Sequence, residues 1–110
     1  MEILLVLTSL PDQSDAKNLA KALVEERLAA CVNILPPCCS IYRWHNVVET
    51  ASEIPLLIKT TQACYPALEA AIHARHPYQT PEIIALPISQ GLPDYLAWIV
   101  AETQNDRTAP

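Results

Sequence analysis

Apolar runs alternate with amphipathic segments along this chain, and their order narrows the possible folds more than any single motif does. Extended, apolar sequence predicts strands at 2–9, at 30–44 with a break at Pro36-Pro37, at 47–61 and at 82–87. Apolar residues at helical spacing predict helices at 12–26, 62–76 and 91–103. The order is therefore strand, helix, strand, strand, helix, strand, helix.

This order is that of the α+β, ferredoxin-like (split βαβ) arrangement with one extra C-terminal helix. We expect an antiparallel sheet with two helices on one face. The chain of 110 residues predicts a single domain over 1–110, with 104–110 as a flexible polar tail.

Local signals mark the ends of these elements. Asp12 is expected to cap the first helix, and Asn46 readily adopts the left-handed backbone of a tight hairpin. Pro66 suits the first turn of the second helix, which Pro77 stops. Pro55 has no N–H to donate, so it must lie at a bulge, at the start of its strand or facing away from a neighbour.

The size of the chain favours self-association. A domain this small buries only about two-thirds of the surface that its unfolded chain exposes, and burying more against copies of itself stabilises it. The long central hairpin is also an exposed sheet edge of the kind that pairs with other chains. We therefore expect a homo-oligomer.

Charge and hydropathy exclude several kinds of partner. The formal charge is −5 and the seven basic residues are scattered, which argues against nucleic acid as a partner. The aliphatic run at 3–7 is too short to span a membrane and no basic stretch precedes it, so we expect a cytoplasmic protein. In that reducing compartment the four cysteines are expected to be free thiols.

The sequence carries no common catalytic motif. A single glycine, Gly91, excludes the Walker loop and the dinucleotide fingerprint, which need several glycines close to phosphate. The G-x-S-x-G, H-E-x-x-H and C-x-x-C patterns are also absent from the sequence. We predict that the protein is not an enzyme.

Four segments in matching order and spacing resemble the CutA divalent-cation-tolerance family. These segments are 23–33, 42–44, 58–61 and 76–83. The resemblance covers nearly the whole chain. It implies a ferredoxin-like subunit with long second and third strands, assembled as a homotrimer like the PII signalling proteins. It also implies a link to copper and other divalent cations.

Glu69, His73 and His76 are the first candidates for a metal site, because their spacing of i, i+4 and i+7 would place them on one helical face. The alternative is a solvated face whose histidines interact with the negative end of the helix. The resemblance implies that His76 is a metal ligand. At the positions where some family members add a histidine and a cysteine to the metal site, this chain has Arg75 and Thr8. We therefore expect weak binding of copper or another divalent cation.

The cysteines offer softer ligands. Cys31 is either a packed thiol in a strand or a partly accessible soft ligand. Cys38-Cys39 could supply thiolates for copper, or they could be adjacent cysteines without a shared role.

Aromatic and charged residues in the family segments predict a contact surface. Tyr42, Trp44, Tyr78 and Trp98 are expected at subunit interfaces, where Tyr and Trp are enriched. Lys59 and Glu82 form either a buried ion pair or, with His76 and Tyr78, the polar lining of an inter-subunit cleft.

The sequence is compatible with three functions. The first is a homotrimer that tempers the effects of divalent cations and binds them weakly. The second is a PII-like signalling trimer that holds a small ligand in its clefts. The third is a structural trimer that acts through a protein partner.

Overall fold

The computed structural model of the chain describes residues 2–104, so the tail predicted at 104–110 lies outside the described residues except for Gln104. The elements follow the predicted order, with the second predicted strand divided in two at the prolines. They are β1 (Ile3–Leu10), α1 (Gln13–Glu25), β2 (Cys31–Ile34), β3 (Cys38–Trp44), β4 (Val47–Thr61), α2 (Tyr65–Arg75), β5 (Ile84–Pro87) and α3 (Pro93–Glu102).

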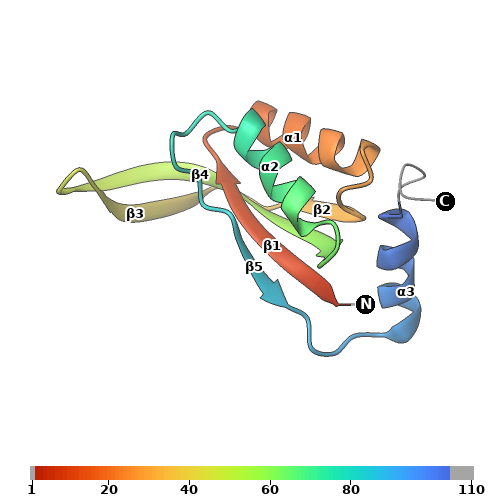
Figure 1. Cartoon of the computed structure of the whole chain (residues 1–110). Coiled ribbons are helices and arrows are strands. Elements are labelled where there is room, and N and C mark those ends of the chain that lie inside the picture. The colour runs from red at the N-terminus through yellow and green to blue at the C-terminus, as the bar shows by residue number, and fades with distance from the viewer. Residues whose placement is uncertain (1, 105–110) are drawn as a thin grey trace.

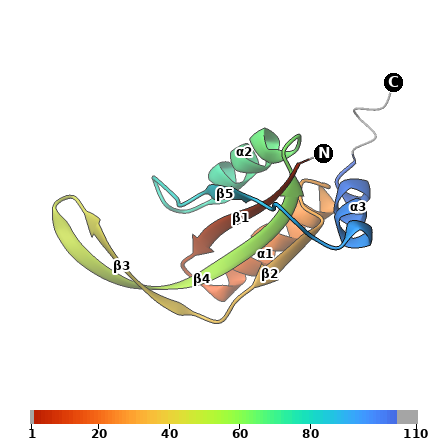
Figure 2. The same cartoon turned by 90° about the horizontal axis from the view of Figure 1, so that it is seen from below.

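The strands form one antiparallel sheet, and α1 and α2 lie side by side on one of its faces (Figures 1 and 2). Within residues 2–104 the order of the strands is β2-β4-β1-β5, and β3 pairs with the remainder of β4. The α+β, ferredoxin-like prediction is confirmed.

The main core lies between the sheet and the two helices. Alternate residues of β1 and β4 face the helices, because successive side chains of a strand point to opposite sides. Val6, Leu56 and Ile58 are fully buried there against Leu23 of α1 and Ile72 of α2. This core holds the sheet and the two helices together as one body.

β2 and β3 behave as one bent strand running along β4. Ile34 lies opposite Leu56 and Cys38 lies opposite Glu53. From the first pair to the second, the β2–β3 segment therefore advances by four residues while β4 advances by three. The extra residue is a bulge at 35–37, where the two prolines interrupt the ladder. Pro55 lies opposite this break and accepts a hydrogen bond from the Leu35 N–H at 2.9 Å. The bulge explanation for Pro55 is thus confirmed.

The predicted turns and caps are also confirmed. His45 and Asn46 have φ angles of 49° and 65°, the left-handed pair that a two-residue hairpin turn requires. The Asp12 carboxylate accepts a hydrogen bond from the Asp15 N–H at 2.8 Å and caps α1. The hairpin formed by β3 and the first half of β4 projects far from the rest of the molecule (Figures 1 and 2).

The second face of the sheet is covered only at one end. Ile99 of α3 packs there against Ile3 and Ala30. The rest of this face is at least partly exposed; beside the polar residues Lys59 and Asn33 it carries an apolar patch, in which Ile84 and Leu86 are 50% and 48% exposed. We call it the open face; its members are Leu5, Leu7, Leu57, Ile84 and Leu86.

Among residues 2–104, no helix combines the length and the apolar character needed to span a bilayer.

Candidate functional site

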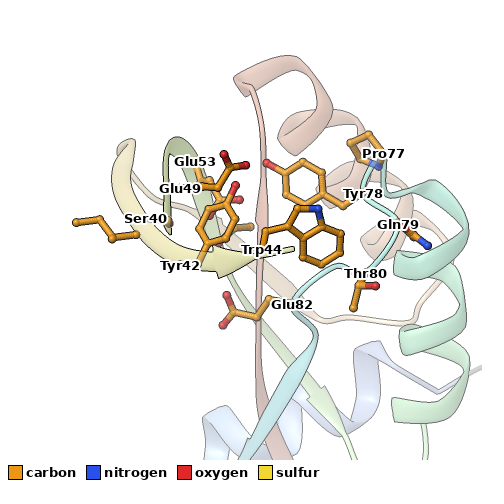
Figure 3. Close-up of a pocket in the computed structure, with 12 residues that line it drawn as sticks. Ser40, Tyr42, Trp44, Glu49, Glu53, Pro77, Tyr78, Gln79, Thr80 and Glu82 are labelled. Carbon is orange, nitrogen blue, oxygen red and sulfur yellow. The ribbon is translucent and has the colours of Figure 1, made fainter. Parts of the chain in front are cut away.

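A cleft of about 770 Å³ separates the β3–β4 hairpin from the loop that follows α2 (Figure 3). One wall is the hairpin, which contributes Tyr42, Trp44, Glu49 and Glu53. The other wall is the 77–82 loop, with Tyr78 and Glu82, and Ser9 at the end of β1 also lines the cleft. The volume falls within the range of small-molecule sites in proteins.

The hairpin wall follows from strand geometry. Tyr42 and Trp44 are two residues apart on β3, so both point to the same side. The tight turn places Tyr42 opposite Glu49, and Glu53 lies four residues further along β4 on the same face. The hairpin therefore presents two aromatic rings and two carboxylates to the cleft.

His76 holds the loop wall in place. Only 8% of the residue is exposed, and the ring Nδ1 accepts a hydrogen bond from the Tyr78 N–H at 3.1 Å. Because Nδ1 accepts, the ring proton lies on Nε2, which donates to the Ser9 carbonyl oxygen at 2.6 Å. His76 thus ties the loop to the end of β1 with both of its nitrogens.

Tyr78 stands over the cleft as a protonated phenol. Its ring centroid lies 4.8 Å from that of His76. Burial first, and then the neighbouring Glu53 carboxylate and Tyr42, together raise the pKa of Tyr78 to about 12. The Tyr78 hydroxyl therefore remains a hydrogen-bond donor across the physiological pH range.

Four of the six residues predicted for the cleft or interface line this cleft: Tyr42, Trp44, Tyr78 and Glu82. Trp98 is instead stacked on Tyr95 in α3, with ring centroids 5.6 Å apart. Lys59 lies on the same side of the sheet as Leu5, its cross-strand partner, and its ammonium donates to the Asn33 side chain.

The predicted ion pair of Lys59 with Glu82 does not form. In the part of the chain that the structure describes, the one side-chain ion pair joins Arg75 to Glu26 at 2.7 Å. Lys59 and His76 also do not line the cleft, so a polar lining made by these two residues with Tyr78 and Glu82 is not present within one subunit.

The predicted three-ligand face of α2 is not assembled either. The helix ends at Arg75, and His76 has an extended backbone with φ −83° and ψ 136°. The residue before a proline avoids the helical region, so Pro77 turns His76 away from the face that carries Glu69 and His73. Within residues 2–104, no three His, Cys, Asp or Glu side chains gather into a group that could hold a metal ion.

Glu69 and His73 remain one helical turn apart and exposed on α2. The Tyr65 hydroxyl donates to the Glu69 carboxylate at 2.9 Å. The pKa of Tyr65 is raised, first by burial and then by this carboxylate. Glu69 is therefore already engaged as an acceptor, with His73 beside it.

The four cysteines lie in the described range and are all free thiols. Cys31 is half-buried, and its sulfur lies 3.8 Å from the Asn33 side-chain oxygen. Cys38 and Cys39 are exposed neighbours on one strand, so their side chains point to opposite faces and do not converge on one ion.

Glu49 and Glu53 are site residues that the sequence motifs did not reveal. The hairpin register could have found them, because a two-residue turn at His45-Asn46 places Glu49 opposite Tyr42. No local signal, in contrast, brings the 77–82 loop beside the hairpin, since that contact depends on the tertiary fold.

Comparison with known proteins gives one consistent result. Residues 4–102 match the family model of the CutA1 divalent ion tolerance protein. The divalent-cation tolerance protein CutA of Thermus thermophilus is 51% identical over 98 residues, which are 89% of this chain and 95% of that protein. A solved structure of the Thermus thermophilus protein superposes with a TM-score of 0.87 at 50% identity, covering 88% of this chain and 94% of the other.

Two further solved structures are similar to this chain. CutA from Xylella fastidiosa has a TM-score of 0.92 and 44% identity, covering 94% of this chain and 100% of that chain. A protein from Archaeoglobus fulgidus, described as a periplasmic divalent cation tolerance protein CutA, has a TM-score of 0.90 and 34% identity. The superposition covers 93% of this chain and 99% of the Archaeoglobus fulgidus chain.

The raised pKa of Tyr78 can be measured directly. In a titration of tyrosine absorbance at alkaline pH, we expect one tyrosine to ionise near pH 12. Glu53→Gln removes a negative charge that opposes ionisation, so the pKa of Tyr78 falls toward its ordinary value while remaining raised by burial. Glu25→Gln, on α1, is the matched control and leaves the titration unchanged. An unchanged curve in Glu53→Gln contradicts the contact between Glu53 and Tyr78.

Proposed function

Since the chain belongs to the CutA1 divalent ion tolerance protein family, we propose that it acts as a homotrimer that tempers the effects of divalent cations, which it binds weakly. The observation that carries the proposal is the match over residues 4–102, which runs from within β1 to the end of α3. The family is named for tolerance of divalent ions and not for a catalysed reaction.

The open face supports the self-association. Its apolar residues include Ile84 and Leu86, each about half exposed in the subunit. The hairpin adds Ile41, Val47 and Val48, which are 70%, 56% and 61% exposed. The cross-strand neighbours of the open face form a contiguous apolar patch, and exposed patches of this kind mark protein contacts. A second copy of the chain offers the same apolar surface, and covering it contributes stability that a small domain needs.

Substitution on the open face tests the assembly. Leu86→Glu places a charge on the open face but leaves the subunit core intact, because Leu86 is 48% exposed. We expect native mass spectrometry to record a trimer for the wild type and predominantly lower species for Leu86→Glu, since burying an unpaired charge costs several kcal/mol. Val24→Glu is the matched control on α1, where Val24 is 41% exposed, and it keeps the trimer.

A trimer that survives Leu86→Glu would mean that the open face is not buried on assembly. A wild-type protein that is monomeric at micromolar concentration would remove the homotrimer itself.

The proposed metal binding rests on few protein ligands. His73 with Glu69 is the exposed pair that an ion can reach on α2, whereas His76 becomes a ligand only if one of its two hydrogen bonds breaks. Two protein ligands leave most of the coordination sphere to water. This arrangement supports weak binding and argues against a tightly held, resident ion.

Calorimetry with Zn(II) and Cu(II) on metal-stripped protein tests this part. We expect weak binding that His73→Ala removes, because the variant deletes the imidazole of the exposed pair. His45→Ala, in the hairpin turn, is the matched control and retains the binding. Absence of heat with either ion, or full binding in His73→Ala, contradicts the proposed site.

The cytoplasm is the proposed location. Cys38 and Cys39 are exposed free thiols, and such thiols persist in a reducing compartment. Immunodetection of the protein after cell fractionation checks this, and recovery in a periplasmic extract would contradict it.

A second candidate function is binding of a small ligand in the cleft, as in a PII-like signalling trimer. The cleft of about 770 Å³ with its aromatic walls favours it. This candidate does not exclude the first, because the cleft and the His73–Glu69 pair are formed by different residues.

A further inference from the structure

The charged side chains that line the cleft are all negative. Three carboxylates line it, those of Glu49, Glu53 and Glu82, and no lysine or arginine is among the described residues that line it. A low-dielectric cleft lined by charges of one sign concentrates ions of the opposite sign. The occupant that this electrostatic field selects is therefore a cation.

The aromatic side chains narrow the kind of cation. Tyr42, Trp44 and Tyr78 lie around the same space as the carboxylates (Figure 3). The face of an aromatic ring attracts an ammonium group, and Trp does so most strongly. Aromatic faces also cover aliphatic carbon, which a bare metal ion does not have.

The carboxylates are placed wrongly for a metal ion. Divalent cations need several oxygen ligands converging within coordination distance. In the described part of the chain no such group of three acidic, His or Cys side chains exists. Glu49 and Glu53 are four residues apart on one strand, a separation of roughly 13 Å along it. Glu82 approaches from the other wall.

We propose that the cleft binds a linear aliphatic polyamine. Its ammonium groups pair with carboxylates spaced along the cleft, and its methylene chain lies on the rings of Trp44 and Tyr42. This proposal rests on the second candidate function, the cleft as a ligand site, and names the class of ligand. It is independent of metal binding at His73.

The loop wall is already ordered to receive such a ligand. His76 fixes the loop to Ser9, and the Tyr78 N–H is held by the same ring. A wall that is fixed before binding lowers the entropy cost of ordering it around a ligand.

Calorimetric titration of the intact, metal-stripped protein with spermidine tests the proposal. We expect one spermidine per subunit, with an affinity that falls as salt is raised, because charge pairs are screened. Glu49→Gln and Glu53→Gln each weaken binding at least about threefold. Trp44→Leu weakens it about fivefold through loss of the ring face.

Glu25→Gln is the matched control, since it removes the same charge from α1 outside the cleft and leaves the affinity unchanged. Equal weakening by Glu25→Gln would show that spermidine binds only as a diffuse counterion of an acidic protein, and would overturn the proposal. So would the absence of binding, or binding that Trp44→Leu leaves unaltered.

Native mass spectrometry of the same variants tests the remaining alternative, in which the cleft residues form a contact between subunits. If Trp44→Leu changes the number of subunits, the cleft is a contact between copies of the chain and the polyamine proposal fails. If wild-type protein binds spermidine and gives no heat with Zn(II), the metal proposal fails and the polyamine proposal stands.

Discussion

The antiparallel pairing of β1 with β4 is the contact on which the rest of the structure depends. It runs from Ile3 opposite Thr61 to Leu10 opposite Ile54 and supplies one side of the main core. Since β1 ends at Leu10, the part of β4 before Ile54 has only β3 as a partner and leaves the body as a hairpin. The cleft forms at that point of departure, with Ser9 beside it.

His76 is best understood as the residue that fixes the second wall of this cleft. Pro77 prevents His76 from continuing α2, so its ring turns inward to the Ser9 carbonyl and not outward along the helix. The backbone N–H of Tyr78 occupies the other ring nitrogen. A histidine that resembles a family metal ligand in the sequence thus acts here as a clamp, and the space that it helps to shape carries the carboxylates and the rings.

The sequence alone predicted those features that depend on local chemistry. The order of elements, the Asp12 cap and the His45-Asn46 turn each follow from the conformational preferences of a few adjacent residues. For Pro55 the sequence left three positions open, and the strand register decides for the bulge. The metal face on α2 was not assembled as predicted because helical spacing was extended by one residue past the helix end, to His76. The placement of Lys59 beside Asn33, and of Glu49 and Glu53 in the cleft, depends on strand register and on long-range contacts that no local pattern encodes.

The central claim is that His76 fixes the cleft wall through both ring nitrogens, and nitrogen NMR of the histidine side chains tests it most directly. In metal-stripped protein at neutral pH, we expect the His76 ring to carry its proton on Nε2, with Nδ1 unprotonated. One equivalent of Zn(II) should leave both His76 signals in place while those of the exposed His73 move. A proton on Nδ1 in the free protein, or a Zn(II)-dependent shift of His76, would contradict the claim.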